Sequence, residues 1–195
     1  MSVPAPLRSE STPASRKQWP LAIVLLGLFS ALGAGAWIHA HQRYKHFAVH
    51  EPGKVYRCAW VEPDVMAELV RKYEIRTVVN LCRPEELGRS RELEEQSAVI
   101  AAGGRVLFLP MPESANPRDT RLEPLKQLLK EPGSFPLLVH CQHGVNRTAR
   151  FLSMYEVLVN GADGEAAVQA MPKFGRRKYA PLEYEFARNF TAAYR

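Results

Sequence analysis

A cysteine and an arginine separated by five residues are best placed for covalent chemistry in this chain. Cys141 follows an apolar run, and Arg147 and Thr148 open a predicted helix. A cysteine attacks phosphorus as its thiolate, and a helix N-terminus with adjacent cations stabilises that charge. The backbone N–H groups between Cys141 and Arg147 can turn inward on phosphoryl oxygens, while the planar guanidinium grips two of them. Gly144 permits the tight backbone path of such a loop. The segment therefore predicts a phosphate-binding loop with a nucleophile at its base.

Strands that alternate with helices are predicted to position this loop. Such alternation is typical of an α/β fold with a mostly parallel sheet that helices cover on both faces. Ligands of these sheets bind beyond the carboxyl ends of the strands, where Cys141 is placed. The predicted strands are 53–58, 76–82, 105–110 and 137–140, and the predicted helices are 62–73, 85–102, 119–130, 147–159, 164–171 and 181–194.

The segment His140–Thr148 resembles the signature of the protein tyrosine and dual-specificity phosphatases, His-Cys-x5-Arg-Ser/Thr. Segments around 55–57, 77–81 and 109–112 are similar to successive elements of bacterial members of the dual-specificity superfamily. The resemblance spans roughly residues 53–171 and implies the fold of those enzymes, a central mostly parallel sheet flanked by helices. We therefore expect a cysteine-dependent phosphatase domain over residues 53–195.

Residue by residue, the resemblance implies a role for each matching position. Cys141 is the nucleophile and Arg147 is the phosphate clamp. His140 orients the loop and keeps the thiolate ionised, and Thr148 offers its hydroxyl to the sulfur as it leaves the phospho-enzyme. The residues between the cysteine and the arginine are expected to bind the substrate, and these are Gln142, His143, Gly144, Val145 and Asn146.

The resemblance also implies a carboxylic acid that protonates the leaving oxygen, on a loop about thirty residues before the cysteine. Glu113 follows Pro112 there, which resembles the family's Trp-Pro-Asp loop with glutamate in place of aspartate. Asp119 is the alternative acid, although an acidic residue at a predicted helix start also fits a purely structural role. A third option is that neither residue acts and that the enzyme relies on good leaving groups.

Cys82 ends the predicted strand 76–82, where some lipid-phosphatase relatives place a cysteine that pairs with the nucleophile on oxidation. It is thus a candidate redox partner of Cys141, and a small buried apolar residue is the alternative interpretation. The three cysteines of the chain have no paired spacing, which argues against a zinc site or a disulfide framework. We expect no metal and no cofactor, because the phosphate-binding loop itself supplies the charge stabilisation.

The N-terminal part has a different composition. Residues 1–18 form a polar tail, and the apolar segment 19–40, with Trp19 and Trp37 near its ends, is long enough to cross a bilayer. We expect an uncleaved transmembrane anchor, with a cleavable signal peptide as the alternative because of Ala34-Gly35-Ala36. A linker at 41–52 would follow. We expect a single-pass protein of the bacterial inner membrane. The basic residues on the two sides of the segment hardly discriminate its orientation. The usual topology of a bacterial signal-anchor favours a periplasmic catalytic domain over a cytoplasmic one.

The net charge of +6 and the pI near 9.4 favour an anionic partner. No array of basic residues alternates with aromatic ones, so nucleic acid is disfavoured. The sequence predicts a phosphomonoesterase that works through a phosphocysteine, with a dual-specificity or tyrosine protein phosphatase favoured. The alternatives are a phospholipid phosphatase, acting on a phosphoinositide or phosphatidylglycerophosphate, and a membrane-tethered pseudophosphatase that only binds phosphate. Nothing in the sequence indicates the oligomeric state.

Overall fold

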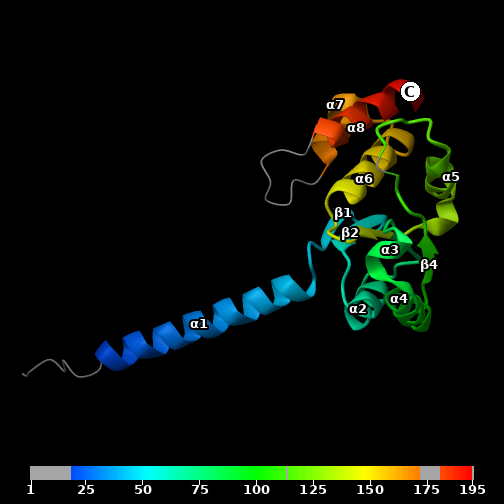
Figure 1. Ribbon diagram of the computed structural model, residues 1–195. Helices are drawn as coiled ribbons and strands as arrows, with labels where there is room; N and C mark the ends of the chain where they lie inside the picture. The colour runs from blue at the N-terminus through cyan, green and yellow to red at the C-terminus, as the bar shows by residue number, and fades with distance from the viewer. Residues whose placement is uncertain (1–18, 113, 172–180, 195) are drawn as a thin grey trace, which may run out of the picture. The chain divides into compact units, whose positions relative to one another are not determined.

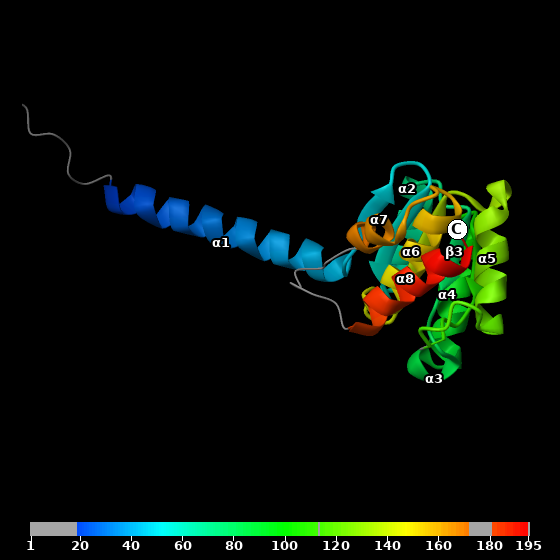
Figure 2. The same ribbon diagram turned by 90° about the horizontal axis from the view of Figure 1, so that it is seen from above.

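The computed structural model describes residues 19–112, 114–171 and 181–194, with the backbone alone at 19–22 and 39–41. The chain divides into two units, 1–40 and 41–195. The helices and strands are shown in Figure 1 and, from above, in Figure 2. In chain order they are α1 (Trp19–Arg43), β1 (Ala48–Glu51), β2 (Val55–Ala59), α2 (Pro63–Lys72), β3 (Thr77–Asn80), α3 (Pro84–Leu87), α4 (Arg89–Ala101), β4 (Arg105–Phe108), the 3-10 helix η1 (Thr120–Leu122), α5 (Glu123–Lys130), the 3-10 helix η2 (Pro132–Ser134), β5 (Leu137–Cys141), α6 (Asn146–Leu158), α7 (Gly164–Ala170) and α8 (Pro181–Tyr194).

The second unit is built on a five-stranded sheet with the order β1-β2-β5-β3-β4. β5 lies at its centre and runs parallel to both neighbours, and β3 and β4 are also parallel. His140 is in register with Cys58 on one side and with Asn80 on the other. The prediction of an α/β fold with a mostly parallel sheet is confirmed, and β5, which carries the candidate nucleophile Cys141, is the central strand.

The edge strand β1 differs from the prediction, because it lies in the segment 41–52 that was expected to be a linker. β1 pairs antiparallel with β2, with Ala48 opposite Arg57. Its Val49 is 45% exposed. An edge strand has a partner on one side only and is half exposed, so it lacks the buried apolar run that reveals a central strand.

Two apolar layers enclose the sheet, because successive side chains of a strand point to opposite faces. Val139 and Cys141 of β5 belong to the layer that contains residues of α5, α6 and α8. Leu138 belongs to the other layer, with residues of α2 and α4. Figure 1 shows α2 and α4 on one side of the sheet and α6, α7 and α8 on the other. This packing holds the carboxyl end of β5 rigidly beneath the start of α6.

The helix predicted over 85–102 is interrupted. Gly88 has a φ of +78° and separates α3 from α4. A residue in this left-handed region cannot continue an α-helix, and glycine adopts it without steric cost. The break produces the short helix α3, which carries Glu86 on the chain segment that leaves β3.

The first unit contains most of α1, which covers the predicted anchor 19–40. Its described apolar side chains are exposed, for example Leu26 and Phe29 at 73% each. Within the described residues, no helix combines the length and the apolar character needed to cross a membrane. The transmembrane anchor stays a prediction.

Candidate active site

The predicted phosphate-binding loop connects β5 to α6. Cys141 is the last residue of β5 and is 2% exposed, and α6 begins at Asn146. Gly144, inside the loop, has a φ of +63°. A Cβ atom at this position would lie 2.6 Å from the backbone nitrogen of Ala59 and would also collide with the carbonyl oxygen of Cys58. Only glycine therefore lets the loop pack against the end of β2.

Hydrogen bonds from neighbouring segments hold the loop's carbonyl groups. The Trp60 N–H donates to the Cys141 oxygen at 3.0 Å, and Nδ1 of His46 lies 2.9 Å from the His143 oxygen. Among the described residues, by contrast, no group accepts a hydrogen bond from the N–H groups of residues 142–145. Unpaired N–H groups at a loop that opens a helix are the arrangement that binds an anion.

Thr148 contacts the candidate nucleophile directly. Its Oγ1 donates a hydrogen bond to the Cys141 sulfur at 3.3 Å, and the Thr148 side chain is fully buried in the first turn of α6. A hydroxyl at this position can stabilise negative charge on the sulfur. The geometry matches the contact that the sequence predicts between these two residues.

A series of buried hydrogen bonds lies behind Cys141, the candidate nucleophile. Nε2 of His140 is 2.7 Å from Oε1 of Glu95, and Oε2 of Glu95 accepts a hydrogen bond from the Asn80 side chain at 2.8 Å. The side-chain oxygen Oδ1 of Asn80 in turn accepts from the Cys82 backbone N–H at 2.9 Å. The His140 and Glu95 side chains are 0% and 2% exposed. These hydrogen bonds therefore fix the orientation of His140. They come from α4 and β3, on the far side of the sheet from α6.

Arg147 is held in place by a bidentate ion pair. Its Nη1 and Nη2 donate to the two carboxylate oxygens of Glu86 at 2.6 and 2.9 Å, and Nη1 also donates to the Leu81 carbonyl at 3.1 Å. Burial disfavours the charged guanidinium, but its hydrogen bonds to Glu86 and the proximity of Cys141 outweigh this effect, so the pKa of Arg147 is raised. The same ion pair, against the effect of burial, lowers the pKa of Glu86. Both groups stay charged.

The roles of Glu86 and Glu95 were not predicted from the sequence. Glu95 is almost fully buried in α4, and the only available signal was an acidic residue at a helix position next to buried Val99. Glu86 sits in an acidic pair after a proline, a pattern that also suits an exposed helix start. Its nearness to Arg147 depends on the break at Gly88, which was not predicted.

The structure describes only one of the two candidate general acids, Asp119. Glu113 lies outside the described residues. The carbonyl of its neighbour Pro112 accepts a hydrogen bond from the buried Arg150 at 3.0 Å. Asp119 is described, and it caps η1 by accepting from the Arg121 N–H and pairs with the Arg121 guanidinium at 2.7 Å. These hydrogen bonds lower the pKa of Asp119. A proton donor near neutral pH needs the opposite shift, so the contacts of Asp119 fit a helix cap.

The other cysteines are buried free thiols, like Cys141. Burial and the nearby Cys141 raise the pKa of Cys82, which keeps its thiol protonated at neutral pH. Burial likewise raises the pKa of Cys58. Pairing of Cys82 with Cys141 on oxidation stays a prediction. Within the described part of the chain, no group of His, Cys, Asp and Glu side chains has the arrangement of a metal site.

Comparison with known proteins places this geometry in a family. Residues 57–183 match the family model described as "PTP-SAK: Swiss Army Knife protein, DSP-PTPase phosphatase domain". Among curated proteins, the dual specificity protein phosphatase TpbA of Pseudomonas aeruginosa strain PAO1 is 32% identical over 121 residues, which cover 62% of this chain and 51% of TpbA. The chain thus spans about half the length of the curated relatives it matches.

Solved structures share the fold. The crystal structure of TpbA is similar with a TM-score of 0.52 and 26% identity, over 75% of this chain and 83% of TpbA. A putative phosphatase from Shewanella putrefaciens CN-32 has a TM-score of 0.61 at 17% identity, over 80% and 98% of the two chains. PTPMT1 in complex with PI(5)P has a TM-score of 0.57 at 17% identity, over 75% and 95%.

The match to the family model covers more than half of the chain and includes β5, the loop after it and α6. Because the nucleophile, the arginine and the threonine of the signature meet within this region, sequence, geometry and comparison agree. The chain belongs to the DSP-PTPase family of phosphatase domains.

Proposed function

We propose that this protein hydrolyses phosphomonoesters through a phosphocysteine intermediate. The Cys141 sulfur attacks phosphorus and forms an S–P bond as the bond to the leaving oxygen breaks. Arg147 and the loop N–H groups bind the remaining phosphoryl oxygens. Water then cleaves the S–P bond, releasing phosphate, and the Thr148 hydroxyl stabilises the departing thiolate. The observation that carries this proposal is the Thr148 to Cys141 hydrogen bond at the foot of a loop with unpaired N–H groups.

In the first step, the leaving oxygen needs a proton. We assign this proton to Glu113 on the loop that Arg150 fixes at Pro112. Asp119 is already committed to Arg121 by two side-chain hydrogen bonds. If Glu113 is the donor, the reaction requires it to be protonated, and turnover falls as the pH rises above its pKa.

On sequence similarity alone, the first candidate substrate class is phosphoprotein. This follows the sequence similarity to TpbA, a dual specificity protein phosphatase. The second candidate is a phosphorylated lipid headgroup, which is favoured by a cationic pocket beside the loop (described below). A protein that only binds phosphate is the third candidate. The intact signature, with its threonine on the sulfur, favours turnover over this option.

The membrane anchor belongs to the same proposal. The apolar segment 19–40 supports it, as do the exposed apolar side chains of α1 such as Leu26 and Leu32. We propose a single-pass protein of the bacterial inner membrane with its catalytic domain in the periplasm. Carbonate extraction of membranes tests this proposal: the full-length chain should stay in the pellet, and the Leu26→Arg/Leu32→Arg variant should be released. Release of the wild-type chain would contradict the anchor.

Turnover of a chromogenic aryl phosphate between about pH 5 and 7 tests the proposed activity. Wild-type protein should release phosphate, Cys141→Ser should be inactive, and Cys58→Ser should serve as the control for loss of a buried thiol. Phosphate binding without turnover in the wild type would identify a binding protein instead. Phosphotyrosine peptides compared with phosphoinositide vesicles then distinguish the two substrate classes.

A further inference from the structure

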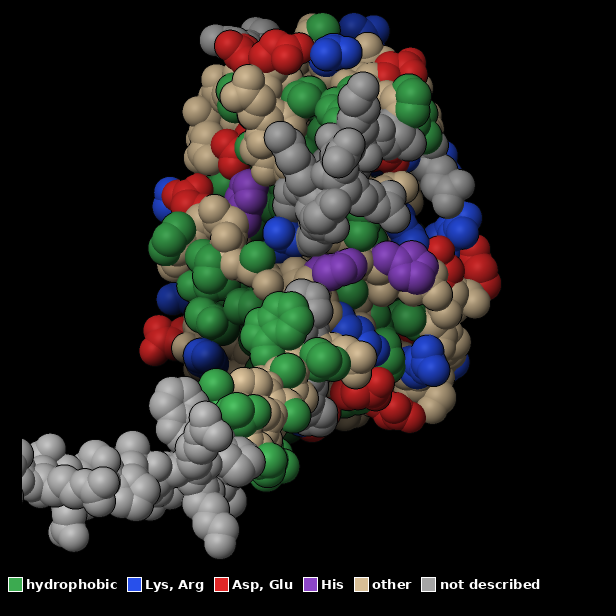
Figure 3. Space-filling model, turned by 90° about the vertical axis from the view of Figure 1, so that its left-hand side faces the viewer, with side chains coloured by type: hydrophobic (Ala, Val, Ile, Leu, Met, Phe, Trp, Pro, Cys, Tyr) green, Lys and Arg blue, Asp and Glu red, His purple; other side chains and the backbone are tan. Residues whose placement is uncertain are grey.

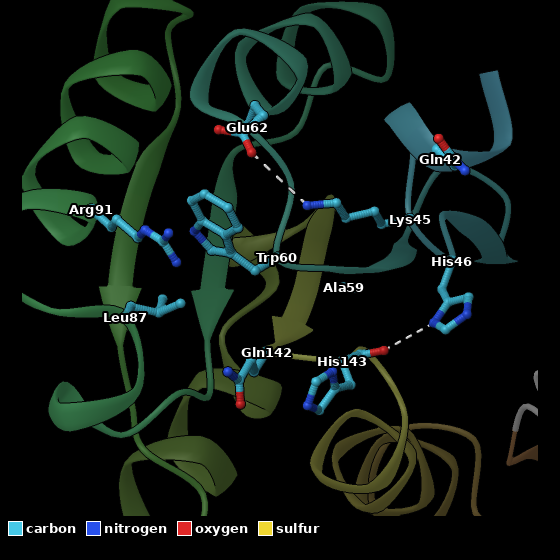
Figure 4. A pocket seen from close by; sticks show the side chains of 10 residues that line it. All are labelled: Gln42, Lys45, His46, Ala59, Trp60, Glu62, Leu87, Arg91, Gln142 and His143. Atoms are coloured by element: carbon cyan, nitrogen blue, oxygen red, sulfur yellow. Dashed lines mark hydrogen bonds and ion pairs between the residues drawn. The ribbon is translucent and has the colours of Figure 1, made fainter. Parts of the chain in front are cut away.

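A pocket of about 560 Å³ lies beside the phosphate-binding loop (Figure 4). Its volume is within the range of small-molecule sites, roughly 300–1,000 Å³. Gln142 and His143, the two residues after the nucleophile, form one wall, and Leu87, next to the Glu86 that holds Arg147, forms another. The backbone N–H of Trp60, another lining residue, donates to the Cys141 carbonyl. The pocket is therefore contiguous with the site of phosphate transfer.

Two cations are fixed on the indole of Trp60 inside this pocket. The Arg91 guanidinium lies 4.8 Å and the Lys45 ammonium 5.2 Å from the centre of the ring, and Figure 4 shows them on different sides of it. Trp60 is only 9% exposed, so it is a rigid platform. Cation–π contacts hold both side chains near the ring before any ligand binds, which reduces the entropic cost of binding an anion.

Among the described residues, Lys45 has one carboxylate within ion-pair distance, that of Glu62, which also lines the pocket. No carboxylate of the described residues forms an ion pair with Arg91. Lys45 approaches Glu62 only at 3.9 Å, and both side chains are partly exposed, 43% and 62%. Such a surface pair is weak, so an incoming anion can displace it. On the face shown in Figure 3, histidine side chains gather near the middle and acidic ones lie mostly toward the edge. Beside the loop, Arg91 and Lys45 thus offer positive charge to a second anionic group of a ligand.

We propose that this pocket is a subsite for a second phosphate of the substrate. The substrate class is then a small polyol that carries phosphates on neighbouring carbons, whether free or as a lipid headgroup. The proposal rests on the phosphatase activity proposed above and names the substrate of the same site. Neighbouring phosphates on one ring suit this arrangement, because the pocket shares Gln142 and His143 with the loop. An acidic residue beside a phosphotyrosine is kept away from the loop by the length of the aromatic side chain, which favours the polyol over a peptide.

Competition against an aryl phosphate substrate tests the subsite. An inositol monophosphate is compared with an inositol bisphosphate whose phosphates lie on neighbouring carbons, and the ratio of their inhibition constants is measured in the full-length chain. The bisphosphate should bind at least about tenfold more tightly, because it adds charge-assisted contacts. Arg91→Gln and Lys45→Gln should each lower this preference by about threefold or more. Arg89→Gln removes an equal charge from the same helix outside the pocket, and it should keep the preference.

Equal inhibition constants in the wild type, or an unchanged preference in Arg91→Gln and Lys45→Gln, would overturn the proposal. An Arg91-dependent preference for an acidic phosphotyrosine peptide over the inositol bisphosphate would also overturn it. Vesicles that contain phosphatidylinositol bisphosphate, compared with its soluble headgroup, distinguish the lipid source from the free one. If the aryl phosphate is not turned over, the proposed activity fails. Calorimetric titration with the same two inositol phosphates then still tests whether the pocket binds a second phosphate.

Discussion

At the scale of residues, the groups around Cys141 differ in what they contact. Thr148 touches the sulfur, while Arg147 is placed to meet the phosphoryl oxygens. Glu86 holds Arg147, and the buried Glu95 holds His140. A guanidinium on a long flexible stem loses less entropy on binding phosphate when a carboxylate already orients it. Glu86 is therefore a positioning residue for phosphate binding.

Glu86→Gln tests this role. The amide keeps the shape but replaces a charge-assisted bidentate pair, worth about 1.5–3 kcal/mol, with weaker hydrogen bonds. We expect kcat/KM for an aryl phosphate to fall by about tenfold or more, and the inhibition constant of inorganic phosphate to rise in parallel. Glu85→Gln is the matched control, because Glu85 is exposed and contacts Arg83 instead. If the variant loses thermal stability but the inhibition constant of inorganic phosphate does not change, Glu86 stabilises the fold and does not position Arg147 for phosphate.

The pH dependence of turnover tests the general acid. Arg121 lowers the pKa of Asp119, so Asp119 carries no proton to donate between about pH 5 and 7. We expect Asp119→Asn to keep the shape of the pH–rate profile. Glu113→Gln should lower turnover and flatten the basic limb, since the proton that is lost there is the one donated to the leaving oxygen. If Asp119→Asn flattens that limb instead, the assignment to Glu113 is wrong.

At the scale of elements, the loop depends on its contact with the end of β2. Gly144→Ala places a Cβ against the backbone of Cys58 and Ala59, which cannot move without displacing the loop. We expect kcat/KM to fall by at least about a hundredfold, since a misplacement of about 1 Å at a reacting centre has effects of this size.

Gly161→Ala is the matched control for this substitution. Gly161 also has a left-handed φ, +65°, but a Cβ there meets no atom within 4 Å. The control should lose about 1 kcal/mol of stability and keep its activity. Equal losses of activity in the two variants would show that backbone strain, and not the contact with β2, causes the effect.

The contact between α4 and β5 through Glu95 and His140 is a second element-scale feature. Glu95→Ala leaves a buried histidine and a buried asparagine without their partner. We expect the free energy of unfolding to fall by about 3 kcal/mol, as for other broken buried pairs. Urea unfolding measures this loss, and Glu94→Ala, on the exposed face of α4, should change it by less than about 0.5 kcal/mol. Equal losses of stability in the two variants would contradict a stabilising role of the buried hydrogen bonds of Glu95.

At the scale of the whole molecule, the sequence was most informative about the centre of the fold. β5 was predictable because a central parallel strand is an unbroken apolar run, and the signature after it is specific. β1 was missed because an edge strand has no such run. The roles of Glu86 and Glu95 could not be predicted, because each acts on a residue more than forty positions away in the chain. Such contacts depend on the order of the strands, which the sequence pattern does not determine.

The order of the strands also explains where the chemistry lies. Because β2, β5 and β3 are parallel, their carboxyl ends deliver Trp60, Cys141 and Cys82 to one edge of the sheet. The loop, the ion pair of Arg147 and the cationic pocket all gather at this edge. If the proposed subsite exists, both phosphates of the ligand would bind at this edge.

The most direct test of this account is the covalent state of Cys141 during turnover. Wild-type protein is mixed with an aryl phosphate, quenched in acid within one turnover, digested and weighed by mass spectrometry. The peptide that contains Cys141 should gain the mass of one phosphoryl group, and Cys141→Ser should prevent turnover. Steady release of phosphate with no modified Cys141 peptide, or undiminished turnover in Cys141→Ser, would contradict the phosphocysteine mechanism.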